Sequence, residues 1–250
     1  MVTAIIQARV NSTRLPNKIF CDIEGFPLIW HIVNRIKTSK KINDIIIATS
    51  DNKKDDILEK WCLTNNIKCF RGSEKNVLER FYFSALKYET EIIARITADD
   101  PFKDPEIIDN VIDMLITKNL DFAFNNKPPT FPEGLDTEIF TFSALKNAYE
   151  NSLDPFEQEH VTQFFYRNPN LFLQKNYSNS QNFSNLRWTV DTEKDLEMVK
   201  VVYKHLFSSK QVFLFNDILN LIYENPWISN INLDVERSIM YKKEVENGEN

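Results

Sequence analysis

Residues 4–18 read AIIQARVNSTRLPNK, an apolar run that ends in a cationic loop. The run over residues 2–8 is continuous and rich in β-branched side chains, which is typical of a strand buried on both faces of a parallel sheet. The loop after it carries three cations and two hydroxyl side chains, namely Arg9, Arg14, Lys18, Ser12 and Thr13. Because such charge-assisted donors suit phosphate oxygens, the loop is a candidate triphosphate-binding loop. A solvated basic turn is the alternative interpretation.

The loop contains no glycine, and neither glycine-rich phosphate-binding pattern, GxxxxGK[ST] or GxGxxG, is present in it. Asn17 stands immediately before Lys18. Asparagine is the commonest non-glycine residue to accept a left-handed backbone conformation. We therefore expect Asn17 to provide the turn that glycine provides in other phosphate-binding loops.

Strand-like and helix-like segments alternate through the first half of the chain. Strands are predicted at residues 42–49, 67–70, 91–97 and 120–125, and helices at residues 28–37, 55–64, 76–88 and 105–118. Strands that alternate with helices of this length imply right-handed crossovers and a sheet covered on both faces. The predicted fold class is α/β, with a mostly parallel, Rossmann-like sheet in three layers.

The second half of the chain is less regular. Three prolines interrupt it at positions 128, 129 and 132, before a segment that resumes at residues 135–140. Beyond that segment we predict helices at residues 143–151, 157–167 and 191–207, and strands at residues 171–177 and 187–190. We interpret residues 1–230 as one domain, with residues 128–180 as an inserted arm or small subdomain. Residues 231–250 are strongly charged and are expected to form a frayed tail.

Composition excludes several classes of protein. The chain has 250 residues, of which 42% are hydrophobic, enough for one substantial core. Its formal net charge of -6 argues against non-specific binding to nucleic acid or to an anionic membrane. No window approaches the roughly 20 apolar residues that cross a bilayer, and the N-terminus does not resemble a signal peptide. Three cysteines without paired spacing predict neither disulfides nor a zinc site, so we expect a cytoplasmic protein.

Two aspartates follow predicted strands, where ligands bind in sheets of this kind. Asp99 follows the strand at residues 91–97, and Asp191 follows the strand at residues 187–190. Nucleotidyl transfer uses a hard cation such as Mg²⁺ held by one or two carboxylates, so these aspartates are candidate metal ligands. Asp100 competes with Asp99, although it could simply cap the turn before a proline. The alternative role of Asp191 is the N-cap of the next helix.

The complete string at residues 5–36, IIQARVNSTRLPNKIFCDIEGFPLIWHIVNRI, resembles the opening of the cytidylyltransferases that activate acidic sugars. Within this group of ulosonate and acylneuraminate synthetases, it is most similar to the spore-coat-polysaccharide, SpsF-like branch. The resemblance covers roughly residues 2–206, because it continues in FRGSEKNVLERFYFSA, RITADDPFKDPEIID, FPEGLDTEIF, EHVTQFFYRNP and LRWTVDTEKDLEMV. It implies a nucleotidyltransferase fold and an enzyme that joins CTP to an acceptor, with Mg²⁺ as cofactor.

The resemblance also implies roles for particular residues. Those expected to bind the nucleotide are Ala8, Arg9, Ser12, Arg14, Lys18, Arg71, Gly72, Ser73 and Arg80. Those expected to be catalytic are Lys18, Arg14 and Asp99, and the expected metal ligands are Asp99 and Asp191. Lys18 would stabilise charge on the α-phosphate as pyrophosphate leaves. The alternative role of Arg80 is an exposed helix charge.

The acceptor is expected over the second half of the sheet. Its candidate contacts are Glu133, Asp136, Glu138, Glu159, His160 and Arg187. Acidic side chains are unusual contacts for an acidic sugar unless they bind hydroxyls, an amine or a metal. His160 would orient or deprotonate the attacking group, with a purely structural histidine as the alternative. The adjacent aromatic residues Phe164, Phe165 and Tyr166 are expected in the core.

The function implied by the resemblance is transfer from CTP to an acidic sugar or related small acceptor, in surface polysaccharide or glycoconjugate biosynthesis. It also implies a homodimer, with the arm at residues 128–141 crossing to the partner. One alternative is a nucleotide-sugar-dependent glycosyltransferase, which usually carries an Asp-x-Asp motif that the adjacent Asp99 and Asp100 do not form. The other is a catalytically silent nucleotide-binding protein, which would be expected to have lost its cationic or acidic residues.

Overall fold

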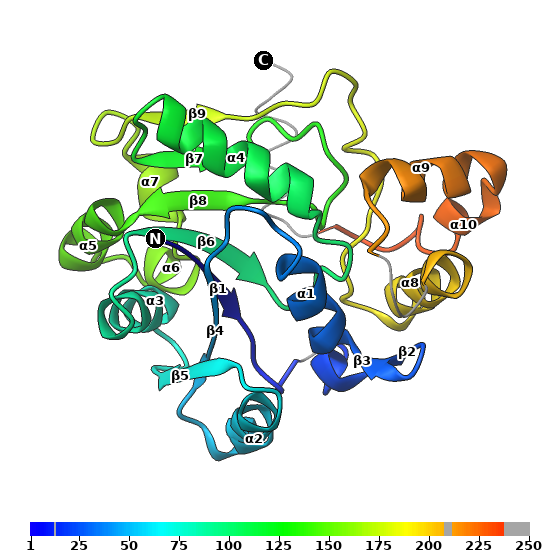
Figure 1. Cartoon of the computed structure of the whole chain (residues 1–250), viewed down its shortest axis with the longest axis horizontal. Coiled ribbons are helices and arrows are strands. Elements are labelled where there is room, and N and C mark those ends of the chain that lie inside the picture. Colours follow the sequence, from blue (N-terminus) through cyan, green and yellow to red (C-terminus); the bar gives the residue numbers. More distant parts are fainter. Residues whose placement is uncertain (13, 208–211, 238–250) are drawn as a thin grey trace.

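A twisted sheet of seven strands runs through the molecule in the order β5-β4-β1-β6-β8-β7-β9 (Figure 1). The computed structural model describes residues 1–12, 14–207 and 212–237, and the structural statements below refer to these. The strands are β1 (Val2–Gln7), β4 (Asp44–Ser50), β5 (Lys68–Gly72), β6 (Ile92–Thr97), β7 (Phe122–Phe124), β8 (Glu138–Thr141) and β9 (Gln174–Asn176). Two short strands, β2 (Asp22–Ile23) and β3 (Phe26–Pro27), form a separate hairpin.

Helices connect the strands and cover both faces of the sheet (Figure 1). They are α1 (Leu28–Ile36), α2 (Asp56–Thr64), α3 (Val77–Lys87), α4 (Pro105–Thr117), α5 (Phe142–Asn151), α6 (Pro155–Glu159), α7 (Gln163–Arg167), α8 (Glu193–Leu206), α9 (Phe215–Glu224) and α10 (Trp227–Asn230). Two 3₁₀ turns, η1 (Lys18–Phe20) and η2 (Lys53–Asp55), lie at the carboxyl ends of β1 and β4. The α/β class predicted from the sequence is confirmed.

One strand of the sheet runs in the opposite direction to the other six. The strands β1, β4, β5 and β6 are parallel to one another. The strand β8 is antiparallel to both of its neighbours, β6 and β7, while β9 pairs in parallel with β7. The sheet is therefore mostly parallel, with one reversed strand at the boundary between its two halves.

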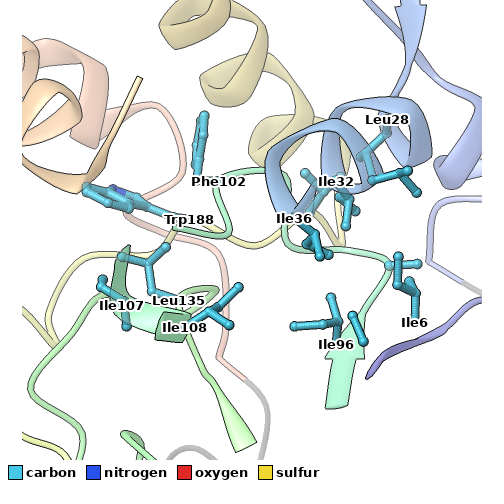
Figure 2. Close-up of a cluster of buried hydrophobic side chains, with 14 of the residues drawn as sticks. Ile6, Leu28, Ile32, Ile36, Ile96, Phe102, Ile107, Ile108, Leu135 and Trp188 are labelled. Carbon is cyan, nitrogen blue, oxygen red and sulfur yellow. The ribbon is translucent and has the colours of Figure 1, made fainter. Parts of the chain in front are cut away.

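Alternating side chains of the central strands pack into two hydrophobic cores, one on each face of the sheet. In β1, Ala4 and Ile6 belong to one buried cluster, whereas Ile5 belongs to the other. The first cluster receives the apolar faces of α1, α4, α8 and α9, and the second those of α3, α5 and α7. Figure 2 shows part of the first cluster, in which Ile6 and Ile96 from the sheet lie below Leu28, Ile32 and Ile36 of α1. Two cores separated by one sheet give the predicted three layers.

The predicted single helix at residues 157–167 is wrong, because the chain breaks it into α6 and α7. Val161 lies between them with a φ of 48°, a left-handed conformation that is costly for a β-branched residue. Its side chain is fully buried in the second core, and this burial offsets the cost. The break places His160 at the C-terminal end of α6.

Two further expectations need correction. Residues 187–190 form no strand, since only a single bridge joins Arg187 to Glu133. The packed region also runs past the expected boundary at residue 230. Asn232 is buried and donates hydrogen bonds to the carbonyl of Arg187 at 3.1 Å and to Asp195 at 2.9 Å. Residues 238–250 of the expected tail lie outside the described residues.

Candidate active site

The loop after β1 is shaped by backbone hydrogen bonds rather than by glycine. Asn17 adopts φ 59° and ψ 20°, so the expected left-handed turn is confirmed. The amide of Asn17 donates to the carbonyl of Val10 at 3.2 Å, and the amide of Val10 donates to Asp55 at 2.8 Å. Asp55 is buried and thereby fixes the loop to the end of the neighbouring strand β4. Thr13, one of the two predicted hydroxyl residues, lies outside the described residues.

The turn at Asn17 directs Lys18 into the protein, between the two candidate metal ligands. Its Nζ atom lies 3.0 Å from Asp99 Oδ2, 3.0 Å from Asp191 Oδ1 and 2.8 Å from the carbonyl oxygen of Val190. Burial lowers the pKa of Lys18, but the two carboxylates outweigh it and hold that pKa above its ordinary value. Two carboxylates from distant parts of the chain thus converge on one buried ammonium group.

The carboxylate of Asp191 is available because another residue caps the following helix. Thr192 is the N-cap of α8, and it forms a reciprocal capping box with Asp195. The alternative role of Asp191 as N-cap is therefore wrong. Besides Lys18, the Asp191 carboxylate binds Arg14 at 2.9 Å and Arg187 at 3.1 Å.

Of the two adjacent aspartates, only Asp99 faces this cluster. The carboxylate of Asp100 is buried against Lys103, 2.9 Å away, and accepts a hydrogen bond from the hydroxyl of Thr97 at 2.5 Å. Lys103 is itself only 1% exposed, so the two charges neutralise each other inside the protein. This arrangement leaves Asp99 as the better candidate ligand at the end of β6.

A cavity of about 330 Å³ lies over the loop, and we call it the loop-side cavity. Among the residues that line it are the predicted nucleotide contacts Ala8, Arg9, Ser12, Arg14, Lys18 and Arg80. Arg9 is exposed and has no ion-pair partner in the described part of the chain, so its charge is available to a ligand. The cavity therefore combines a free cation with the buried ammonium of Lys18.

Arg80 is not the exposed helix charge considered as its alternative role. It is 2% exposed, and burial lowers its pKa to about 10. Its Nη1 donates to the carbonyl of Ser73 at 2.9 Å, while its buried Nε has no partner among the described residues. An unpartnered buried donor beside a cavity is suited to a ligand oxygen.

Residues 71–73 do not line this cavity, so their contact with a nucleotide stays a prediction. The guanidinium of Arg71 instead binds Asp56 at 2.7 Å and Glu59 at 2.8 Å on α2. Gly72 lies against Arg80, since a Cβ added to it would come within 3.4 Å of that side chain. The segment supports Arg80 because it packs beneath it and supplies the Ser73 carbonyl.

A second cavity of about 300 Å³ lies beside β8, and we call it the β8-side cavity. Its lining includes Arg95, Asn126, Glu133, Asp136, Glu138 and Tyr166. The two cavities meet, because both are lined by Arg14, Thr97, Asp99, His160 and Asp191. The pair of carboxylates that holds Lys18 is therefore at the junction of two binding spaces.

The predicted acceptor contacts differ in where they lie. Glu133, Asp136, Glu138 and His160 line the β8-side cavity, whereas Glu159 lines the loop-side cavity. Arg187 lines neither, and its contact with an acceptor stays a prediction. It is buried between Glu133 at 2.9 Å, Asp195 at 2.9 Å and Asp191, so these carboxylates neutralise its charge inside the protein. Arg187 holds these carboxylates in position.

The sequence analysis missed three side chains of the β8-side region. Arg95 on β6 forms an ion pair with Glu138, and the hydroxyl of Tyr166 lies 2.9 Å from the same glutamate. Lys103 donates to the backbone carbonyl of Asp136. A charged residue in the apolar strand EIIARIT is the signal that could have identified Arg95. The expectation of a core position holds for Phe164 and Phe165, which are buried, but not for Tyr166.

Gly134 brings the two sides of the β8-side cavity together. Its φ is +106°, and an added Cβ would lie 2.8 Å from the amide nitrogen of Thr189 and 2.8 Å from the carbonyl carbon of Trp188. The same contact is held by the Trp188 amide, which donates to the carbonyl of Glu133 at 2.7 Å. Only glycine permits this approach of the two backbones.

We expect Gly134→Ala to lower the free energy of unfolding by about 3 kcal/mol, because backbone strain and steric overlap act together. Gly25→Ala is the matched control, since Gly25 also has a positive φ, +83°, but has nothing within 4 Å of the added Cβ. Its expected loss is about 1 kcal/mol from strain alone. Urea unfolding of both variants measures the difference, and equal losses would contradict the close approach.

A comparison with known protein families identifies the fold and the chemistry together. A cytidylyltransferase family model matches residues 3–224, which include the loop after β1, both candidate metal ligands and both cavities. The chain belongs to the cytidylyltransferase family. It is accordingly a CTP-dependent nucleotidyltransferase. The resemblance drawn from the sequence segments is confirmed, and nucleotidyl transfer is favoured over the glycosyltransferase and silent-protein alternatives.

Similar proteins align over nearly the whole chain. An uncharacterised protein of Methanocaldococcus jannaschii is 36% identical over 239 residues, covering 94% of this chain and 96% of that protein. The spore coat polysaccharide biosynthesis protein SpsF of Bacillus subtilis is 32% identical over 229 residues, covering 89% of this chain and 94% of its own. The structure of a cytidylyltransferase from Leptospira borgpetersenii superposes with a TM-score of 0.87 at 30% identity, covering 95% and 98% of the two chains.

Two observations bear on metals and membranes. Within residues 1–12, 14–207 and 212–237, no group of three or more histidine, cysteine, aspartate or glutamate side chains is arranged to hold a metal ion. A site made of two carboxylates, completed by oxygens of a nucleotide and by water, does not require such a group. None of the described helices is long and apolar enough to span a bilayer.

Proposed function

We propose that this chain transfers the cytidylyl group of CTP to an acidic sugar or a related small acceptor, with release of pyrophosphate, in the synthesis of a surface polysaccharide or glycoconjugate. The polysaccharide setting is supported by the similarity to the Bacillus subtilis protein. The observation that carries the proposal is the meeting of the loop-side and β8-side cavities at Asp99 and Asp191. A nucleotide in one cavity and an acceptor in the other would react between these carboxylates.

In this proposal the loop-side cavity binds CTP. Arg9 and Ser12 would bind the terminal phosphates, and the buried Arg80 would donate its unpartnered Nε to the nucleoside end. Lys18 and Arg14 would neutralise charge that develops on the α-phosphate while the acceptor oxygen attacks in line and pyrophosphate leaves. Most of the catalysis would come from positioning and electrostatic stabilisation, because the chain contributes no covalent intermediate.

The residues present also fit a divalent cation. Asp99 and Asp191 already bind one positive charge in common, the Lys18 ammonium, so their oxygens converge on a point that favours a cation. These two aspartates would hold Mg²⁺. When bound, the ion would polarise phosphate oxygens as a Lewis acid.

The domain boundaries and the oligomeric state belong to the same proposal. Residues 1–230 would form the nucleotidyltransferase domain, together with at least Asn232, which packs against it. Within that domain, residues 128–180 would bind the acceptor and contribute to a homodimer. A cytoplasmic location would follow from the use of CTP.

Mixing the protein with CTP, Mg²⁺ and a panel of acceptors tests the proposed function. We expect pyrophosphate release with at least one ulosonic acid, sugar phosphate or other phosphorylated small molecule, and a strong preference for CTP over UTP, ATP and GTP. A coupled phosphate assay measures the release, and calorimetry measures CTP binding separately. Binding of CTP without turnover across a broad panel would instead support a silent nucleotide-binding protein.

A further inference from the structure

One carboxylate of the β8-side cavity, that of Asp136, has no side-chain partner among the residues that the structure describes. The other acidic residues that line this cavity all form ion pairs: Asp99 with Lys18, Asp100 with Lys103, Glu133 with Arg187, Glu138 with Arg95, and Asp191 with Lys18. No side-chain hydrogen bond or ion pair of Asp136 is found within the described part of the chain. Lys103 passes close to it but donates to the backbone carbonyl of Asp136 and to the Asp100 carboxylate.

We propose that Asp136 is the catalytic base that accepts the proton of the attacking hydroxyl on the acceptor. The inference rests on the proposed function and adds a residue role to it. Asp136 lines the same cavity as Asp99 and Asp191, so the three carboxylates border one space that can hold an acceptor. Its carboxylate is partly exposed to that cavity and is free to change its protonation state without breaking an ion pair.

The surroundings of Asp136 suit a base that works near neutral pH. Burial raises its pKa to about 7, the nearby carboxylates of Asp100, Glu133 and Glu138 contribute to this rise, and Lys103 only partly offsets it. A base is most effective when its pKa lies near the working pH. The paired carboxylates of the cavity are poorer candidates, since protonation would cost each of them an ion pair.

His160 also lines the cavity and forms no ion pair with the described residues. Burial lowers the pKa of its imidazole, and the nearby cation of Arg95 adds to this, although Glu159 acts in the opposite direction. The ring also packs against Phe156 with centroids 4.5 Å apart, which is typical of a structural contact. These contacts favour Asp136 over His160 as the base.

A base is required only for one class of acceptor. A hydroxyl must lose a proton as its oxygen bonds to the α-phosphorus, whereas a phosphate oxygen is already ionised at neutral pH. The role of Asp136 therefore applies to an acceptor that attacks through a hydroxyl.

The step balances without another reactant. The bond from the acceptor oxygen to the α-phosphorus forms, and the bond from the α-phosphorus to the bridging oxygen of pyrophosphate breaks. The hydroxyl proton passes to the Asp136 carboxylate and then to solvent. No group is oxidised or reduced.

The test compares wild type, Asp136→Asn and Asp136→Glu with two probes, 3-deoxy-manno-octulosonate for hydroxyl attack and glucose 1-phosphate for phosphate attack. Water serves as the hydroxyl probe if the sugar acid does not enter the cavity. For hydroxyl attack we expect kcat of the wild type to rise with pH to a plateau above about 7. Asp136→Asn should lower kcat by roughly 10²–10⁴ and abolish this rise, whereas Asp136→Glu should retain it.

Three outcomes would overturn the assignment of Asp136 as the base. The first is a kcat for Asp136→Asn within about threefold of the wild-type value. The others are loss of the pH dependence of kcat in His160→Gln but not in Asp136→Asn, and faster turnover of glucose 1-phosphate than of either hydroxyl probe. Asp113→Asn, on the outer face of α4, is the matched control and should behave as wild type. Calorimetry keeps the two proposals separate. Absence of CTP binding by the wild type would refute the proposed function itself, whereas normal CTP binding with unaltered rates would refute only the role of Asp136.

Thermal unfolding supplies a readout that does not depend on the acceptor. Because the pKa of Asp136 is raised in the folded state, the folded protein retains the proton over a range where the unfolded chain has lost it. The carboxylate therefore costs stability increasingly as pH rises from about 4 to 7. Asp136→Asn removes this cost, so its Tm should exceed that of wild type by more at pH 8 than at pH 5. An equal difference at both pH values would contradict the raised pKa.

Discussion

Replacing Lys18 with methionine is expected to lower kcat for pyrophosphate release by about 10³, because in the proposed function the α-phosphate loses a preorganised cation. Methionine has a similar length and no charge, so it removes the ammonium without opening a large cavity. The substitution also leaves Asp99 and Asp191 facing each other without the Nζ atom that lies 3.0 Å from each. We expect the free energy of unfolding to fall by about 3 kcal/mol, as when one partner of a buried ion pair is removed.

The response of Tm to Mg²⁺ distinguishes a lysine that lies between two metal-binding carboxylates from a lysine on the surface. Millimolar Mg²⁺ should raise the Tm of Lys18→Met by more than it raises that of wild type, since only the variant lacks its own cation between the carboxylates. Lys194→Met is the matched control. That lysine lies on the surface of α8, where it pairs with the exposed Asp234, so both stability and turnover should change little. A Lys18→Met protein that is as active as the control would refute the proposed catalytic role.

Asp191→Asn and Asp195→Asn are expected to fail in opposite ways, although the two residues stand one helical turn apart. Asp191 faces the junction of the cavities, and its substitution should lower Mg²⁺-dependent kcat by about 10²–10³. Its stability loss should be smaller, about 2 kcal/mol, because Lys18 keeps Asp99 as a partner and Arg187 keeps Glu133 and Asp195. Asp195 is completely buried, binds Arg187 and Asn232, and completes the capping box of α8. Its substitution should lower the free energy of unfolding by about 3 kcal/mol.

Urea unfolding and a Mg²⁺ titration of turnover, applied to both variants, measure this contrast. Asp99→Asn should reproduce the loss of Mg²⁺ response seen in Asp191→Asn. Retention of full Mg²⁺-dependent turnover in both Asp99→Asn and Asp191→Asn would show that the metal assignment is wrong. A variant Asp195→Asn that folds normally but loses turnover would indicate that the ligand is Asp195 instead.

Local sequence patterns predicted the first half of the fold well. Each strand of the parallel half is a short apolar run, and each helix between them carries apolar residues at helical spacing, so periodicity alone separates the elements. The same patterns failed where long-range packing decides the conformation. Val161 takes a left-handed conformation that no local rule predicts, because its side chain completes a core formed by α3 and α5. The pairing of β8 between β6 and β7 is likewise set by contacts distant in sequence.

The candidate site was predictable in its residue types but not in its partnerships. Asn17 was expected to replace glycine, and it does so because its left-handed preference is a local property. Arg187 was expected to face a ligand, yet three carboxylates surround it, and a sequence does not reveal which charges neutralise one another. For the same reason Arg95 was missed, and Asp136 could not be distinguished from the acidic residues around it.

The reversed strand β8 separates the parallel strands β5, β4, β1 and β6 from β7 and β9. The loop-side cavity is lined mainly by residues before position 100, whereas the β8-side cavity draws on residues 126–166. The backbone that shapes the first cavity is anchored by hydrogen bonds to Val10 and Asp55, and none of these comes from the second half. If the β8-side cavity binds the acceptor as proposed, substitutions around β8 would change the acceptor with less effect on nucleotide binding than substitutions in the loop after β1. For protein engineering, this makes the β8 half the natural place to diversify a library.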